Sequence, residues 1–80
     1  MIKWDLERPR WLQLMEILRG RIQDGTYRGK IPSFKQLVQE FELGINTVKH
    51  AVDALAEQGY VRKVESLGTF VRPPQDWPER

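Results

Sequence analysis

Residues 31–71 decide the fold of this chain, and they read IPSFKQLVQEFELGINTVKHAVDALAEQGYVRKVESLGTFV. Pro32 disfavours a helix that continues from upstream, and the Ser33 hydroxyl can accept a hydrogen bond from the free amides of a first turn. Gln36 stands three residues after Ser33, which completes a capping-box pattern. A first short helix is therefore expected to begin after Ser33. Its apolar face recurs at helical spacing, at Phe34, Leu37, Val38 and Phe41.

A second, longer helix is expected after a tight turn at residues 42–44. Gly44 tolerates the backbone of such a turn, and the new helix begins at Ile45. Gly59 ends it as a C-cap. Its buried stripe is formed by Val48, Ala51, Val52, Leu55 and Ala56. Its outward positions near the start are polar, and they are Asn46, Thr47, Lys49, His50 and Asp53.

Beyond the second helix, the apolar period changes from helical to alternating, which is typical of strands. We predict strands over residues 60–64 and 69–72, joined by a short turn at residues 65–68. In the first strand, Tyr60 is expected on the opposite side from Val61. The consecutive prolines that follow end the hairpin, because neither can donate to a ladder. This order of elements describes a helix-turn-helix with a wing, whose commonest use is reading double-stranded DNA.

The segment before residue 31 supplies a further helix. Pro9 suits its first turn, and Asp24 with Gly25 suits its end. Trp4 is expected in a short extended segment that covers the edge of the bundle. The apolar stripe of this helix is Trp11, Leu14, Met15, Leu18 and Ile22. The expected fold is mainly α with a small β-hairpin, a three-helix winged helix-turn-helix over residues 1–72, followed by a Pro-rich C-terminal tail over residues 73–80.

Three segments carry a resemblance to a known family: IPSFKQL, LGINTVKHAVDALAEQG and SLGTFV. In their order and spacing they resemble the DNA-binding domain of the gluconate-repressor (GntR-type) bacterial transcription regulators. The upstream segment WLQLMEILRGRIQDGTY is similar to the first helix of that family, so the resemblance covers nearly the whole chain. It implies a cytoplasmic, sequence-specific double-stranded DNA-binding regulator, a repressor, with the longer helix in the major groove and the wing on the adjacent backbone or minor groove.

The chain departs from the family pattern at several contact positions. Phe34 and Lys35 stand where the family usually has Glu-Arg, and Gly44 and Ile45 stand where it has Ser-Arg. Lys49 replaces a further arginine, and a lysine keeps the charge but loses the planar fork that grips guanine or phosphate at two points. Ile45 can at most meet a thymine methyl group. We therefore expect the fold of the family with a different DNA preference.

The expected DNA-binding residues lie on both helices and on the wing, where Ser66 replaces the first wing glycine of the family. They are Lys35, Ile45, Asn46, Thr47, Lys49, His50, Ser66 and Gly68. Thirteen Lys and Arg against eleven Asp and Glu give a formal net charge of only +2. A basic face can still form locally, with Glu65 as the only acid expected near the wing. The candidates for that face are Arg28, Lys30, Lys35, Lys49, Arg62 and Lys63.

Composition argues against several other functions. The chain has no cysteine and a single histidine, so neither a disulfide nor a metal site is expected. No carboxylates or hydroxyls fall into a catalytic arrangement, and we expect neither an enzyme nor a cofactor. No apolar run approaches the length of about 20 residues that spans a bilayer, and no secretory signal opens the chain. The expected location is the cytoplasm.

Two questions stay open at this level. A winged-helix module that binds protein, with weak or no DNA binding, is the alternative to a DNA-binding regulator. The 80 residues leave no room for a small-molecule effector domain. Three alternatives follow: a homodimer through the chain's own surface, a homodimer that forms only on DNA, or a weakly binding monomer. Trp4, Trp11 and Trp77 are the candidate interface residues, although Trp77 can equally pack back on its own domain.

Overall fold

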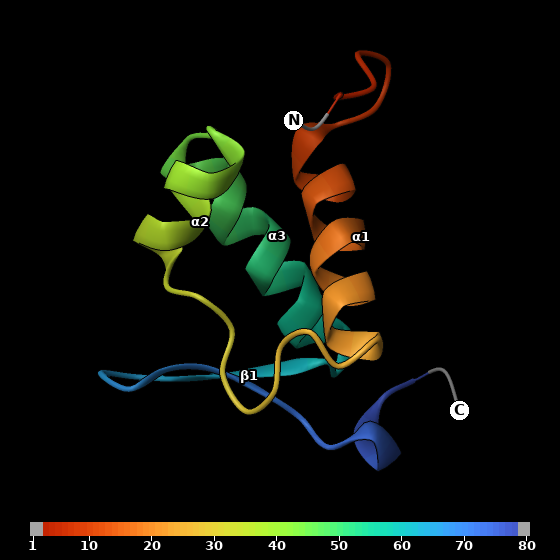
Figure 1. Ribbon diagram of the computed structural model, residues 1–80, viewed down its shortest axis with the longest axis vertical. Coiled ribbons are helices and arrows are strands. Elements are labelled where there is room, and N and C mark those ends of the chain that lie inside the picture. The colour runs from red at the N-terminus through yellow and green to blue at the C-terminus, as the bar shows by residue number, and fades with distance from the viewer. Residues whose placement is uncertain (1–2, 79–80) are drawn as a thin grey trace.

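The computed structural model describes residues 3–78; residues 1–2 and 79–80, at the ends of the expected domain and tail, lie outside the described part. Figure 1 shows three helices grouped on one side of a two-stranded hairpin. The elements are α1 (Arg10–Gln23), α2 (Phe34–Phe41), α3 (Ile45–Gln58), β1 (Val61–Val64), β2 (Gly68–Val71) and a 3-10 turn, η1 (Pro74–Asp76). This arrangement confirms the expected three-helix winged helix-turn-helix. No helix in the described range is long and apolar enough to cross a membrane.

The start of α2 follows from local chemistry. The Ser33 hydroxyl accepts from the Gln36 amide at 3.2 Å, and the Gln36 side chain accepts from the Ser33 amide at 2.9 Å. Both halves of the capping box are therefore formed, and two free amides of the helix start are satisfied.

The turn between α2 and α3 differs from the expectation. Glu42, not Gly44, takes the left-handed conformation that ends α2, with φ 56° and ψ 42°. Its amide donates to the Val38 carbonyl at 2.9 Å and closes the last turn. Gly44 has φ −67° and ψ 158°, an extended conformation open to any residue, and it serves as the N-cap of α3. The tight turn therefore does not require a glycine at position 44.

The hydrophobic core lies between the three helices and the base of the hairpin, with α3 packed against both α1 and α2. The apolar faces expected from helical spacing are largely buried. The exceptions, which are only partly buried, are Trp11, Phe34, Val38 and Ala56. The fully buried large side chains are Tyr60, Leu14, Leu18, Ile22, Leu37, Leu55, Val48, Val52 and Val61.

The hairpin pairs β1 with β2 antiparallel, from Val61 opposite Val71 to Val64 opposite Gly68. The expected separation of Tyr60 and Val61 onto opposite sides is wrong, because both side chains are buried. Tyr60 follows the C-cap residue Gly59, and its amide closes the end of α3 by donating to the Leu55 carbonyl at 3.0 Å. The first strand therefore begins at Val61, one residue later than predicted.

A third segment extends the sheet beyond β2. Lys30 forms an antiparallel bridge with Phe70. The Ile31 amide donates to the Thr69 carbonyl at 3.0 Å, and the Val71 amide donates to the Gly29 carbonyl at 2.7 Å. The base of the wing is therefore supported by residues 29–31 on one edge of β2 and by β1 on the other.

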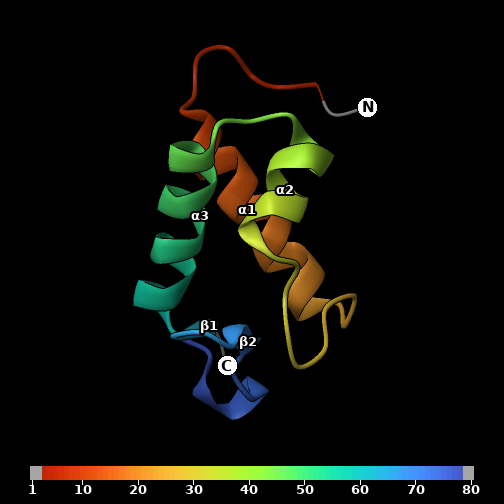
Figure 2. The ribbon, with the colours of Figure 1, turned by 90° about the vertical axis from the view of Figure 1, so that its left-hand side faces the viewer.

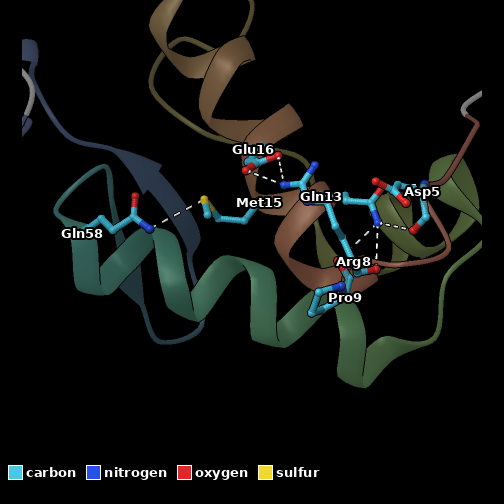
Figure 3. Close-up of polar contacts among 7 residues, drawn as sticks. All are labelled: Asp5, Arg8, Pro9, Gln13, Met15, Glu16 and Gln58. Atoms are coloured by element: carbon cyan, nitrogen blue, oxygen red, sulfur yellow. Dashed lines mark hydrogen bonds and ion pairs between the residues drawn. The ribbon is translucent and has the colours of Figure 1, made fainter.

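The segment before α1 is fastened to the bundle by Gln13, as Figure 3 shows. The Gln13 side chain accepts from the Asp5 amide at 2.8 Å and donates to the carbonyls of Asp5 and Arg8 at 2.8 and 2.9 Å. Arg8 also donates to both carboxylate oxygens of Glu16 at 2.7 and 2.8 Å. The Trp4 ring lies 6.4 Å from the Phe41 ring, so this segment covers the edge of the bundle as expected.

Further contacts join α1 to α3 and hold the tail against the domain. Gln58 of α3 donates to the Met15 sulfur of α1 at 3.6 Å (Figure 3). In the tail, the Trp77 ring lies 5.7 Å from the buried Tyr60 ring, and the Trp77 indole donates to the Arg72 carbonyl at 2.9 Å. Trp77 therefore packs back on its own domain, which was one of its two sequence interpretations.

Candidate nucleic-acid interface

The first turns of α3 present the polar face expected from the sequence. Asn46, Lys49 and His50 are exposed, and Thr47 is half-buried. Ile45, at the first position of the helix, is 43% exposed, which is unusual for a large apolar side chain in this domain. The opposite face of the same turns carries buried core residues. The helix therefore offers hydrogen-bonding groups and one apolar group to the outside at its start.

Helix α2 and the wing share one side of the molecule with α3. Figure 2 shows α2 and α3 in front of α1, with the hairpin seen nearly end-on below them, so the wing projects toward that same side. Lys35, the second residue of α2, is exposed. Ser66 and Gly68 lie at the turn of the hairpin and are exposed as well. All eight expected site residues therefore belong to the α2, α3 and wing elements that form this side.

The wing turn depends on unusual backbone conformations at both of those residues. Ser66 has φ 71°, and Gly68 has φ 120°. A Cβ added at Gly68 would overlap the side chain of Lys30, which crosses over it. Gly68 is therefore favoured by its backbone conformation, since the flexible Lys30 side chain can move aside, whereas Ser66 occupies a left-handed position that glycine adopts more easily.

An ion pair links the wing to α3. Lys63 of β1 donates to the Asp53 carboxylate, and both side chains are about half exposed. Glu65 is therefore not the only acid beside the wing, as the sequence suggested, and Lys63 is partly neutralised. Asp53 lies one helical turn after Lys49, so Lys49, Asp53 and Lys63 follow one another along the surface from α3 to the wing. The two paired residues are separated by ten positions, which no helical or strand period reveals.

His50 is held by a contact that the sequence did not indicate. Its ring stacks on the Trp11 ring of α1, with centroids 3.9 Å apart and planes 16° apart. Trp11 was expected in the core, but it is only partly buried and supports a residue of the candidate interface instead. The imidazole is therefore oriented by α1 and is not a freely moving surface group.

A second charged cluster fixes the loop after α1 against α2. Arg21 donates to the Tyr27 hydroxyl at 2.6 Å and pairs with Glu40 at 2.8 Å. Partial burial alone would lower the pKa of the Arg21 guanidinium, but these hydrogen bonds outweigh it and the net pKa lies above its usual value.

Side-chain and backbone hydrogen bonds from Thr26 hold the pKa of Asp24 below its usual value. The stabilisation from Asp24 is thus present above the usual carboxyl range and is lost as pH falls through the lowered pKa.

Across residues 3–78, no three His, Cys, Asp or Glu side chains gather closely enough to hold a metal ion. The features that the structure does bring together are an exposed polar helix start, a second helix before it and a braced hairpin on one side. These features define a winged helix-turn-helix.

Comparison with known proteins identifies the family. The family described as "Bacterial regulatory proteins, gntR family" matches residues 11–71. The chain therefore belongs to the gntR family of bacterial regulatory proteins, which confirms the resemblance seen in its three sequence segments. The match covers α1, α2, α3 and both strands of the wing.

Individual relatives agree with this assignment. YurK, an uncharacterized HTH-type transcriptional regulator of Bacillus subtilis (strain 168), is 32% identical over 84% of this chain and 28% of its own length. The arabinose metabolism transcriptional repressor of Geobacillus stearothermophilus is 32% identical over 84% of this chain and 19% of its own length. The match with this chain thus spans only 19% to 28% of the length of these relatives.

Solved structures share the fold, and one of them is close to this chain in size. The crystal structure of the AraR DNA-binding domain in complex with operator ORX1 superposes with a TM-score of 0.80 at 30% identity, covering 90% of this chain and 93% of that one. A GntR-type putative transcriptional regulator from Rhodococcus sp. RHA1 gives a TM-score of 0.76 at 32% identity, covering 84% of this chain and 33% of that one. The chain therefore aligns with nearly the whole of the isolated AraR domain and with a third of the Rhodococcus regulator.

Proposed function

We propose that this chain is a sequence-specific double-stranded DNA-binding domain that acts in transcription regulation, as a repressor. The observation that carries the proposal is the common side shared by the exposed start of α3, Lys35 of α2 and the wing. The likeness to the operator-bound AraR domain supports it. The site of action is the cytoplasm, where a bacterial chromosome lies.

Helix α3 enters the major groove with its first turns. An asparagine can donate to and accept from adenine, and a threonine hydroxyl can meet any base edge, which are the roles of Asn46 and Thr47. Ile45 supplies apolar contact to a thymine methyl. Lys49 contacts a guanine edge or a phosphate as a point charge, since it lacks the fork of an arginine.

The remaining site residues position the duplex. Lys35 at the start of α2 and His50, held on Trp11, contact backbone phosphates. The wing turn at Ser66 and Gly68 lies against the adjacent backbone or minor groove. Contacts of this kind fix register and orientation, while the α3 residues carry most of the base readout.

The experiment is the salt dependence of binding to duplex DNA selected from a random pool. Each phosphate contact releases counterions, so Lys35→Ala and Lys49→Ala should each make the negative slope of log K against log salt shallower by about 1. If the lysine instead reads a base, its loss should weaken binding about 5- to 150-fold. Arg19→Gln is the control, because it also removes one positive charge, but from α1 and not from the proposed interface. Arg19 donates to the Gln58 side chain near the end of α3.

Two outcomes would overturn the proposal. Wild-type slope and affinity in both lysine variants would remove the docking of α2 and α3 on DNA. Duplex binding with neither sequence preference nor salt dependence would leave the protein-binding module as the better description of this winged helix.

Pairing of two chains on DNA is the second part of the proposal. One recognition helix reads only a few base pairs, and specific binding usually needs two half-sites about one helical turn apart. The three candidate tryptophans already contact their own chain, at Phe41, His50 and Tyr60. We therefore expect a monomer or weak dimer in solution and cooperative binding to an inverted repeat. Sedimentation of the free protein measures its oligomeric state, and titration of single and double half-sites measures cooperativity. Equal, non-cooperative affinity for both duplexes would contradict this expectation.

A further inference from the structure

The tip of the wing carries an exposed apolar side chain. Leu67 is 61% exposed and lies between Ser66 and Gly68. Its amide donates to the Val64 carbonyl at 3.1 Å, which closes the turn. The ladder ends where Val64 pairs with Gly68, so Leu67 stands beyond the last pair and contributes nothing to the core. Folding therefore does not explain a leucine at this position.

The tip is held in place from both edges of the hairpin. On the β1 edge, Lys63 is tied to Asp53 of α3. On the β2 edge, residues 29–31 add hydrogen bonds to the strand, and the Lys30 side chain covers Gly68. Leu67 is thus presented by a supported turn and not by a free loop, which lowers the entropy cost of placing it against a partner.

The wing points to the same side as α2 and α3 (Figure 2). Lys49 and Asp53 are neighbours one helical turn apart on α3, and Asp53 forms an ion pair with Lys63 of the wing. A duplex that receives the start of α3 in its major groove therefore brings a flanking strand and the next minor groove toward the hairpin. The exposed side chain at the turn of the hairpin, Leu67, is neutral and apolar.

We propose that Leu67 enters the minor groove beside the α3 site and reads it by apolar contact, so that binding favours a minor groove without the guanine amino group. This inference rests on the proposed DNA-binding function. The minor groove distinguishes A·T from G·C pairs chiefly by the guanine N2 amino donor. A leucine cannot accept that hydrogen bond, so a G·C pair there leaves a buried donor unpaired, whereas the apolar sugar edges suit the leucine.

The salt dependence of binding distinguishes an apolar contact of Leu67 from a phosphate contact. Leu67→Ala should weaken specific binding by about tenfold, the scale of burying most of a leucine side chain, while the salt slope stays at its wild-type value. Leu67→Lys should instead raise the slope by about 1, because it adds a cation beside the backbone. The urea unfolding curve of Leu67→Ala should match the wild type, since Leu67 lies outside the core.

Inosine substitution tests the minor-groove readout directly. An inosine·cytosine pair keeps the major-groove acceptors of guanine but lacks its minor-groove amino group. In a selected duplex, G·C pairs that flank the α3 site are introduced and then replaced by inosine·cytosine. We expect wild-type protein to bind the inosine duplex several-fold more tightly than the G·C duplex, and we expect Leu67→Ala to bind both equally.

The failure of this inference differs from the failure of the proposed function. If Lys49→Ala weakens binding while Leu67→Ala and inosine change nothing, Leu67 does not read the groove, but the domain still binds DNA. If Leu67→Ala changes the sedimentation of the free protein, the leucine belongs to an interface between copies, and the inference is wrong. If wild-type protein shows neither sequence preference nor a salt slope, both proposals fall.

Discussion

Replacing Gly44 with serine should stabilise the protein. Gly44 is the N-cap of α3 with φ −67° and ψ 158°, and it makes no side-chain cap. The N-cap of α2, Ser33, has nearly the same backbone, with φ −64° and ψ 162°, and its hydroxyl accepts from the amide three residues on at 3.2 Å. A Cβ at Gly44 meets nothing within 4 Å. Serine at position 44 can therefore adopt the cap geometry already present in the same chain.

The magnitude follows from measured N-cap preferences. Serine is a better N-cap than glycine by a few tenths of a kcal/mol, a net difference that already includes the freedom that the unfolded chain loses when a glycine is removed. We expect Gly44→Ser to raise the free energy of unfolding by about 0.3–0.5 kcal/mol, which corresponds to a rise of roughly 1–4 °C in Tm for a domain of this size.

Urea and thermal unfolding followed by circular dichroism measure this change. Gly44→Ala is the matched control, because it gains the same backbone restriction without a cap oxygen and should fall below Gly44→Ser by about 1 kcal/mol. Gly68→Ser is the opposite control and should destabilise, since Gly68 has φ 120° and lies against Lys30. A loss of stability in Gly44→Ser, or equal stability of the serine and alanine variants, would refute the assignment of a capping role to position 44.

Three further substitutions test the core, the first cap and the link to the wing. Ser33→Ala should cost about 1 kcal/mol in urea unfolding, because it removes the capping box of α2. Leu55→Ala should cost about 2–5 kcal/mol in the same assay, because the side chain is fully buried, whereas Leu67→Ala should change stability by less than about 0.5 kcal/mol. Asp53→Asn should make the negative salt slope of DNA binding steeper by up to about 1, because it frees Lys63 and removes an acid from the interface. An unchanged slope would show that Lys63 of the wing lies away from DNA.

Helix ends and helix faces were predictable because their causes are local. The capping box at Ser33 and Gln36, the start of α3 at Ile45 and its end at Gly59 all depend on residues within one or two turns. The left-handed residue of the turn before α3 was not predictable in the same way. Glycine is the usual left-handed residue, which drew attention to Gly44, whereas the exposed Glu42 has φ 56° and Gly44 serves as the N-cap of α3.

Contacts between elements were not predictable in the same way. The stacking of His50 on Trp11, the pairing of Asp53 with Lys63 and the strand-like segment at residues 29–31 each join positions with no shared period. The residue types of the candidate site were readable from the sequence, because polar residues at the start of a capped helix stand out against its apolar stripe. What holds those residues in place became visible only when the elements were packed together.

The pairing of charges explains how a chain with a net charge of +2 can bind a polyanion. Three ion pairs, Arg8–Glu16, Arg21–Glu40 and Arg72–Asp76, join residues outside α3 and the wing turn. Within the described residues, Lys30, Lys35, Lys49 and Arg62 make no ion pair and are exposed, and Lys30 lies beside Gly68 of the wing. Charges farther away than about 8 Å are screened at physiological salt, so these four cations set the local field and the total charge does not.

These four cations give the salt dependence an expected size. If each meets one phosphate, log K should fall with log salt at a slope of about −4 for one chain on a half-site and about −7 for two chains on an inverted repeat. Titrations of single and double half-sites across a range of salt concentrations measure both values. A slope near −4 on both duplexes would show that the second chain does not bind, whereas a slope near zero would show that the exposed lysines of α2 and α3 do not face the backbone.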